Sequence, residues 1–153
     1  MKKLYSFSTL IFIVALFTGC SKDILKPYDD RIVGVWELDD VNRIGWGSTN
    51  LNFTQGRFTF YGSGKAEYED GNGGFYEGRW DIRTHTYTNG YTDENGNYNS
   101  NSNTMRSLQI NVTDFVTHDV RSEYFDDMQF TGTNKFKAYL YDGSRTYVFK
   151  FRR

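Results

Sequence analysis

"RFTFYGSGKAEYEDGNGGFYEGRWDI" (57–82) holds the pattern that decides the fold: short runs of alternating apolar and polar residues separated by glycine-rich segments. Phe58 and Phe60 alternate with polar side chains in the first run, and Tyr76 and Trp80 do so in the last. A period of two is typical of a β-strand with one buried and one solvated face. The GSG and DGNGG segments have the composition of tight hairpin turns. The stretch therefore predicts antiparallel strands joined by short connections.

The same alternation continues toward the C-terminus in SLQINV (107–112), KFKAYL (135–140) and RTYVFKF (145–151). Beyond residue 19, no stretch shows a convincing helical period. Many short strands joined by tight turns predict an all-β domain, either a sandwich or an up-and-down barrel. Roughly 120 residues are available for it, which is enough for one domain with one modest core.

Residues 1–19 have the organisation of an export signal. Lys2 and Lys3 give a positive start, and the apolar run at 9–17 is too short for a comfortable membrane span. Small residues then lead to Cys20, the only cysteine of the chain. This arrangement resembles the lipobox of bacterial lipoproteins. The resemblance implies a cleaved signal peptide (1–19) and an acylated Cys20.

Acyl chains on Cys20 would anchor the protein in a membrane, since each buried CH₂ contributes about 0.8 kcal/mol. The alternative is an ordinary secretory signal with Cys20 as a bystander. A lone cysteine cannot form an internal disulfide. Ser21 after the cysteine favours the outer membrane, at its periplasmic face or on the cell surface. Residues 20–30, with the only proline at Pro27, are expected to be a tether, and residues 31–153 the domain.

"IVGVWELDDV" (32–41) opens that domain, and its Gly34-x-Trp36 sequence resembles the start of lipocalins and related calycin barrels, where the Trp closes one end. The resemblance implies a single antiparallel up-and-down β-barrel of about eight strands. In lipocalins an Arg of the last strand packs across that Trp. The last strand of an even-stranded barrel lies antiparallel to the first, so Arg152 is the expected partner and Arg153 the alternative. A core Trp unrelated to this family is the competing interpretation.

Arg145 begins the last predicted strand and has the same parity as Tyr147, so both point inward at the open end if either does. An inward Arg-x-Tyr pair resembles the carboxylate grip of fatty-acid-binding proteins, another calycin branch. An Arg fork donates two parallel hydrogen bonds to a carboxylate. The alternative is a solvent-exposed ion pair between Arg145 and Asp142 in the preceding turn.

Aromatic residues make up 18% of the chain. They fill a small barrel in one interpretation, because Phe and Tyr favour strands. In the other they line a cavity, since eight-stranded barrels can hold one small ligand. The candidate ligand-binding residues are Tyr68, Tyr76, Trp80, Arg145 and Tyr147.

No catalytic, cofactor-binding or metal-binding residue is predicted. His85 and His118 are far apart and are expected to be exposed at strand ends. DENGNYN (93–99) begins like a calcium loop, but Thr104 stands where a bidentate Glu is needed. Residues 88–104 have loop composition without apolar periodicity, and we expect them to be disordered.

Without residues 1–19 the chain carries 16 basic and 19 acidic side chains, a net charge of −3. A nucleic-acid partner is therefore not expected, since there is no basic stripe to meet phosphates. We expect a non-enzymatic, lipid-anchored envelope protein that binds a small apolar or amphipathic ligand. The alternative is a structural or interaction lipoprotein with a filled barrel that docks onto another envelope protein.

Overall fold

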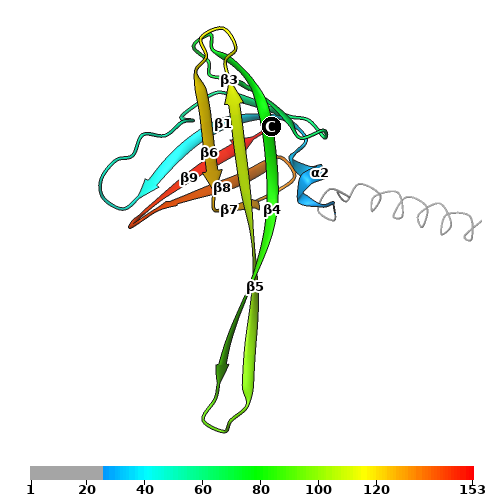
Figure 1. Cartoon of the computed structure of the whole chain (residues 1–153), viewed down its shortest axis with the longest axis vertical. Helices are drawn as coiled ribbons and strands as arrows, with labels where there is room; N and C mark the ends of the chain where they lie inside the picture. The colour runs from blue at the N-terminus through cyan, green and yellow to red at the C-terminus, as the bar shows by residue number, and fades with distance from the viewer. Residues whose placement is uncertain (1–25) are drawn as a thin grey trace, which may run out of the picture.

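The computed structural model describes residues 26–153, so the predicted signal peptide, Cys20 and the first part of the tether lie outside the described residues. The described chain forms a short helix, α2 (Tyr28–Ile32), followed by one nine-stranded antiparallel sheet (Figure 1). The strands are β1 (Gly34–Ile44), β2 (Arg57–Phe60), β3 (Lys65–Glu69), β4 (Phe75–Thr92), β5 (Tyr98–Thr113), β6 (Val120–Phe125), β7 (Asp127–Phe130), β8 (Lys135–Asp142) and β9 (Arg145–Arg152). The all-β prediction is confirmed.

Consecutive strands are neighbours in the sheet except for β6 and β7, which lie at its two ends in the order β6-β5-β4-β3-β2-β1-β9-β8-β7. Across the part of the chain that the structure describes (residues 26–153), the only pairing between non-consecutive strands joins β1 to β9, from Glu37↔Arg152 to Ile44↔Thr146. The last strand thus lies antiparallel to the first, as expected for an up-and-down arrangement.

The sheet is not closed into a barrel, which corrects the prediction of a closed barrel of about eight strands. Residues 120–130 form one bent segment whose first half pairs with β5 and whose second half pairs with β8. In the described chain no ladder therefore joins β6 to β7. Where β5 approaches β7, the strands are joined by a backbone-to-side-chain hydrogen bond and not by a backbone ladder. The backbone N–H of Arg106 donates to Asp127 Oδ1 at 3.2 Å. Membership of the lipocalin family stays a prediction.

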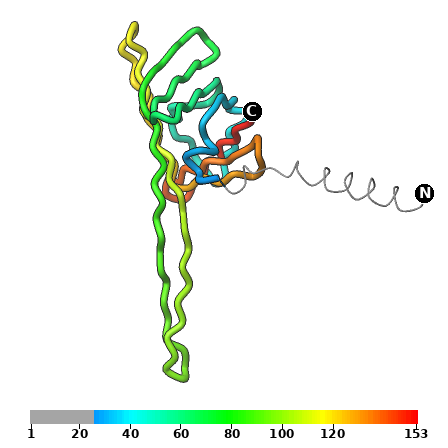
Figure 2. Tube along the Cα trace, turned by 90° about the vertical axis from the view of Figure 1, so that its right-hand side faces the viewer, coloured from blue at the N-terminus to red at the C-terminus, as the bar shows by residue number. Residues whose placement is uncertain are grey.

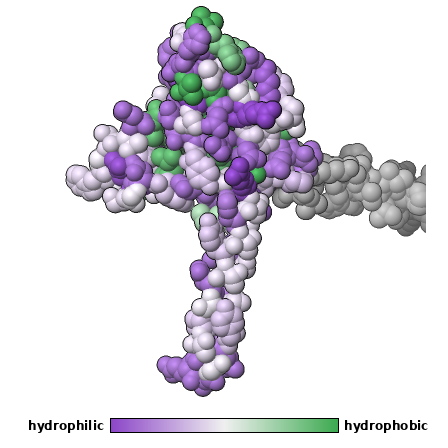
Figure 3. Space-filling model, viewed as in Figure 1, coloured by the Kyte–Doolittle hydropathy of each residue, from purple (hydrophilic) through white to green (hydrophobic). Residues whose placement is uncertain are grey.

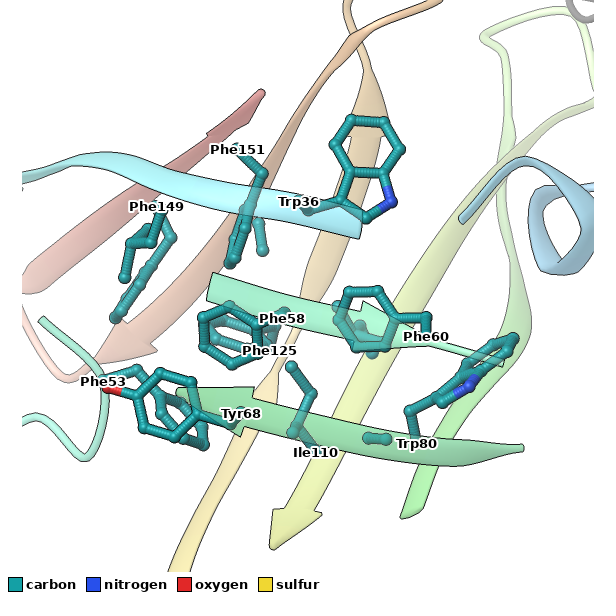
Figure 4. Close-up of a cluster of buried hydrophobic side chains, with 14 of the residues drawn as sticks. Trp36, Phe53, Phe58, Phe60, Tyr68, Trp80, Ile110, Phe125, Phe149 and Phe151 are labelled. Atoms are coloured by element: carbon teal, nitrogen blue, oxygen red, sulfur yellow. The ribbon is translucent and has the colours of Figure 1, made fainter. Parts of the chain in front are cut away.

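The core lies on the concave face of the sheet, where the inward side chains are largely aromatic (Figure 4). Phe58 and Phe60 of β2 are buried there together with Phe149 and Phe151 of β9, as their alternation predicted. Helix α2 covers one end of this core through Ile32, which is fully buried. Helix α2 thus includes residues 28–30, which the sequence assigns to the tether, and Tyr28 packs against the core.

Strands β4 and β5 continue far beyond the body as a two-stranded ribbon (Figures 1 and 2). Their pairing runs without a register shift to Thr92↔Tyr98, whereas β6 pairs with β5 only from Leu108 onward. We call residues 83–107 the arm. Contrary to the expected disorder of 88–104, only residues 93–97 form a turn, which backbone bonds between Asp93 and Asn97 close. The apparent calcium-loop start is this hairpin turn.

Candidate functional site

Three of the four aromatic residues predicted to line a cavity, Tyr68, Tyr76 and Trp80, are core residues whose polar atoms are bonded within the protein. Tyr68 Oη donates to the carbonyl of Gln55 at 2.8 Å, and Trp80 Nε1 donates to that of Tyr61 at 3.0 Å. Tyr76 Oη lies 2.9 Å from Asp119 Oδ2. Burial raises the pKa of Tyr68 to about 12, so its hydroxyl keeps its proton at neutral pH. None of the three offers a free polar group to a ligand.

Ring-to-ring contacts occupy the space between these side chains (Figure 4). The Tyr68 ring centroid lies 4.5 Å from that of Phe58 and 4.9 Å from that of Phe53, which enters from the β1–β2 loop. Phe125 meets Phe149 edge-on at 4.8 Å on the other side. Offset and edge-to-face pairs at these distances are the packing of a filled interior.

At the end covered by α2, Trp36 is fully buried and an arginine lies across its ring, as the lipocalin resemblance implied. The arginine is Arg153, whose guanidinium carbon lies 4.5 Å from the ring centroid. Its two terminal nitrogens donate to the carbonyls of Val33 and Thr133. Gly34 adopts φ +130°, and a Cβ there would lie 3.2 Å from Arg153. Both features favour glycine at this position.

The predicted Arg152 is therefore the wrong arginine, and the alternative, Arg153, is right. Side chains alternate along β9, and Phe151 takes the inward position. Arg152 consequently points to the outer face, where it forms ion pairs with Asp39 at 2.9 Å and with Glu37 at 3.5 Å.

At the opposite end of β9 the structure does not join Arg145 and Tyr147 into a carboxylate grip. The Arg145 guanidinium pairs with Asp142 and donates to the carbonyl of Ser48 at 3.0 Å. Asp142 thus pairs with Arg145 as the competing interpretation expected. Tyr147 is buried, and its hydroxyl has no hydrogen-bond partner within the described residues.

A surface groove of about 560 Å³ lies beside Tyr147, between β1 and the loop that follows it. Val41 and Leu51 give it apolar walls, and Asp40 and Arg43 give it charged ones. Asp40 is already paired with Lys150 at 2.8 Å, and that hydrogen bond holds the pKa of Asp40 below its ordinary value. Tyr147 lines the groove, while its hydroxyl oxygen is buried from solvent.

The arm is the feature that sequence reasoning missed. Thr86, Thr88 and Ser102 lie on one of its faces, and Tyr87, Asn89 and Asn101 lie on the other, because side chains alternate across a ribbon. Figure 3 shows an arm surface of mild hydrophilicity, in contrast to the strongly polar and apolar patches of the body. Residues 84–92 and 98–105 contain no Asp, Glu, Lys or Arg.

Neither a metal centre nor a spanning helix is found in the described part of the chain. Within residues 26–153, no three or more His, Cys, Asp or Glu side chains are grouped so that they could hold a metal ion. The expected exposed strand-end position is wrong for His85, which is half-buried within β4 beside Ser107; His118 is exposed between β5 and β6, as expected. No helix of this part is long and apolar enough to cross a membrane.

Comparison of the chain with protein-family models, curated proteins and solved structures gives no match.

Proposed function

We propose that this protein is a lipid-anchored component of the bacterial cell envelope that acts through its surface, with a filled interior. The observation that carries the proposal is that three of the predicted ligand-binding residues already have their hydrogen bonds and their packing satisfied within the protein. Tyr68, Tyr76 and Trp80 each have their polar atom bonded within the protein, and aromatic rings pack between them. A domain without a free interior leaves its outer surface for recognition.

The arm is the element best suited to that recognition. It projects from the body as a ribbon with exposed backbone and side chains, including Tyr91 at 63% exposure (Figure 2). The described chain begins beside α2, on a different side of the body from the arm (Figure 1). An acyl anchor at Cys20, on the outer membrane, would therefore leave the arm free to contact a partner.

A fluorescent fatty acid titrated into the purified protein tests the filled interior. We expect no saturable binding, and native mass spectrometry should give the mass of the protein without a co-purified small molecule. Saturable binding of the fatty acid at a site other than the groove beside Tyr147 would contradict a filled interior.

A photo-crosslinking amino acid placed at Tyr91 tests the arm as the docking element, with Tyr141 of β8 as the matched exposed position on the body. In membranes of the producing cell we expect a crosslinked protein from position 91 and none from position 141. Absence of any adduct from position 91 would contradict docking by the arm.

A small polar or amphipathic ligand in the groove is the second candidate function. The observation that favours it is the buried Tyr147 hydroxyl, which has no partner among the described residues. An unsatisfied buried hydroxyl costs about 1–3 kcal/mol, and a ligand group that enters the groove wall could supply the missing hydrogen bond. A ligand of this kind would raise the melting temperature of the native protein and would raise that of Tyr147→Phe by less, because the variant binds it more weakly.

In the absence of ligand, Tyr147→Phe is expected to leave the free energy of unfolding unchanged or to raise it by about 1 kcal/mol, because it removes an unpaired polar atom. Tyr76→Phe is the matched control, since its hydroxyl is bonded to Asp119. That variant should lose about 0.5–1.5 kcal/mol. Urea unfolding measures both, and a clear loss in Tyr147→Phe would show that its hydroxyl is already satisfied.

A further inference from the structure

We infer that the arms of two copies of this chain pair through their β4 edges, antiparallel about a twofold axis at Thr88, to form a four-stranded ribbon. The inference rests on the proposed function, in which the arm is the docking element. It adds the identity of the partner, a second copy of the chain, and the residues that face each other.

The β4 edge is free along most of the arm. Strand β3 pairs with β4 only as far as Lys65↔Arg79, and the N–H of Trp80 then donates to the carbonyl of Gly64. From residue 81 to residue 92, β5 is the only neighbour of β4 within the described chain. Backbone groups alternate in direction along an antiparallel strand, so those of the even-numbered residues point to the free edge, as those of Trp80 do.

This edge lacks the devices that usually prevent strands from associating. Proteins protect sheet edges with charges, prolines, bulges or very short strands. Residues 84–92 contain no charged residue or proline, and their pairing with β5 has no register shift. The two edges of the body are protected: β6 carries Arg121 and Glu123, and β7 has only four residues.

Two twofold registers use nearly the whole free edge, with axes at Tyr87 and at Thr88. The Tyr87 axis sets Asp81 opposite Asp93, and like charges directly opposite each other destabilise a sheet, so the Thr88 axis is favoured. An axis at Thr88 sets Thr84 opposite Thr92 and Thr86 opposite Gly90. These even-numbered residues form hydrogen-bonded pairs of two bonds each, about ten bonds in total. An axis at Thr86 would push Thr92 against Trp80, whose N–H is already taken, and an axis at Gly90 would shorten the paired length.

The register with its axis at Thr88 also matches charges at both ends of the ribbon. It sets Arg83 of each copy opposite Asp93 of the other, and every pair between them is uncharged. Hydrogen bonds from Asn97 hold the pKa of Asp93 below its ordinary value, so this carboxylate is ionised at neutral pH. Arg83 now pairs with Asp81 at the exposed root of the arm, an ion pair worth little in water.

The β5 edge of the arm is less suitable. The N–H of Arg106 is already bonded to Asp127, which shortens that free edge. A twofold axis at Ser102 would set Arg106 opposite Tyr98, without a carboxylate to meet the charge. Of the two free edges of the arm, only the β4 edge therefore matches itself in both hydrogen bonds and charges when two copies pair.

Cysteine crosslinking tests the register, because a residue on the axis faces itself. Facing residues in a hydrogen-bonded pair have Cα atoms about 5.5 Å apart, which suits a disulfide. The full chain with Thr88→Cys, in membranes under mild oxidant, should give a disulfide-linked dimer. Thr92→Cys is the matched control on the same edge, and its two copies would lie about 26 Å apart. It should form no dimer alone but should crosslink to Thr84→Cys.

Two further variants separate edge pairing from loss of fold. Thr86→Pro in the Thr88→Cys chain removes an N–H that points to the free edge, so the β4–β5 ladder stays intact. It should lower dimer formation at least tenfold, whereas Ser102→Pro, on the β5 edge, should leave it unchanged.

Equal crosslinking of Thr88→Cys and Thr92→Cys, or crosslinking through Ser102→Cys in their place, would overturn the inference. An adduct of the Tyr91 photo-crosslinker with a different protein, together with no Thr88→Cys dimer, would also overturn it while leaving the proposed docking function standing. No adduct and no dimer would contradict both.

Discussion

Trp36→Ala is expected to lower the free energy of unfolding by about 3–5 kcal/mol, the range for truncating a large buried aromatic side chain. Trp36 is fully buried, and its ring lies 4.8 Å from that of Phe136 and 4.5 Å from the guanidinium carbon of Arg153. Its Nε1 donates to the carbonyl of Ile32 at 2.6 Å, which ties α2 to the sheet. The substitution removes all three contacts and leaves a void. A loss of this size is a large share of the roughly 5–15 kcal/mol typical of a domain.

Trp46→Ala is the matched control, because Trp46 is 95% exposed in the β1–β2 loop. It should change the free energy of unfolding by less than about 0.5 kcal/mol. Chemical denaturation followed by circular dichroism, which does not depend on either tryptophan, measures the two variants. Equal stabilities would show that Trp36 does not close the end of the core.

Local alternation encodes which face of a strand is buried, and that part of the fold was predictable. Phe58, Phe60, Phe149 and Phe151 are all buried, and their polar neighbours on the strands are more exposed. The same rule also identifies Arg153 in place of Arg152, since Tyr147, Phe149 and Phe151 set the inward parity of β9. The error at Arg152 came from the expected position along the strand, without regard to the direction of the side chain.

Closure of the sheet was not predictable from alternation, because a period of two says nothing about which strand lies beside an edge. One residue, Asp126, separates β6 from β7, and its N–H donates to the carbonyl of Tyr139 at 2.8 Å. The bent segment therefore changes neighbours from β5 to β8 at this point. Whether the sheet closes thus depends on long-range strand pairing, which alternation does not encode.

The arm was missed because burial patterns detect only strands that have a buried face. Neither face of the ribbon packs on the body beyond its root, so threonine, asparagine and serine take the place of apolar residues. A signal was nevertheless present: Thr84, Thr86 and Thr88 alternate with aromatic and amide side chains on one side of the DENGN turn. This strand propensity before a turn indicates the first strand of a hairpin even without a core, whereas the asparagine- and serine-rich second strand gives no such signal.

Cys20→Ser is expected to abolish acylation of the chain. The thiol of Cys20 is the only one available to carry the lipid, and serine offers a hydroxyl that cannot form the thioether. Metabolic labelling with a tagged fatty acid measures the result directly. The native protein should carry label and sediment with membranes, and the variant should carry none.

Ser21→Ala is the matched control, since it alters the neighbouring residue and keeps the thiol. It should be labelled as strongly as the native chain, while its distribution between the two membranes reports on the role of Ser21. Equal labelling of Cys20→Ser and the native chain would contradict the lipid anchor.

The lipid anchor should also favour pairing of the arms. Anchored copies share a thin layer at the membrane, so their effective concentration is higher than in solution. The Thr88→Cys dimer should then form less readily once Cys20 is replaced.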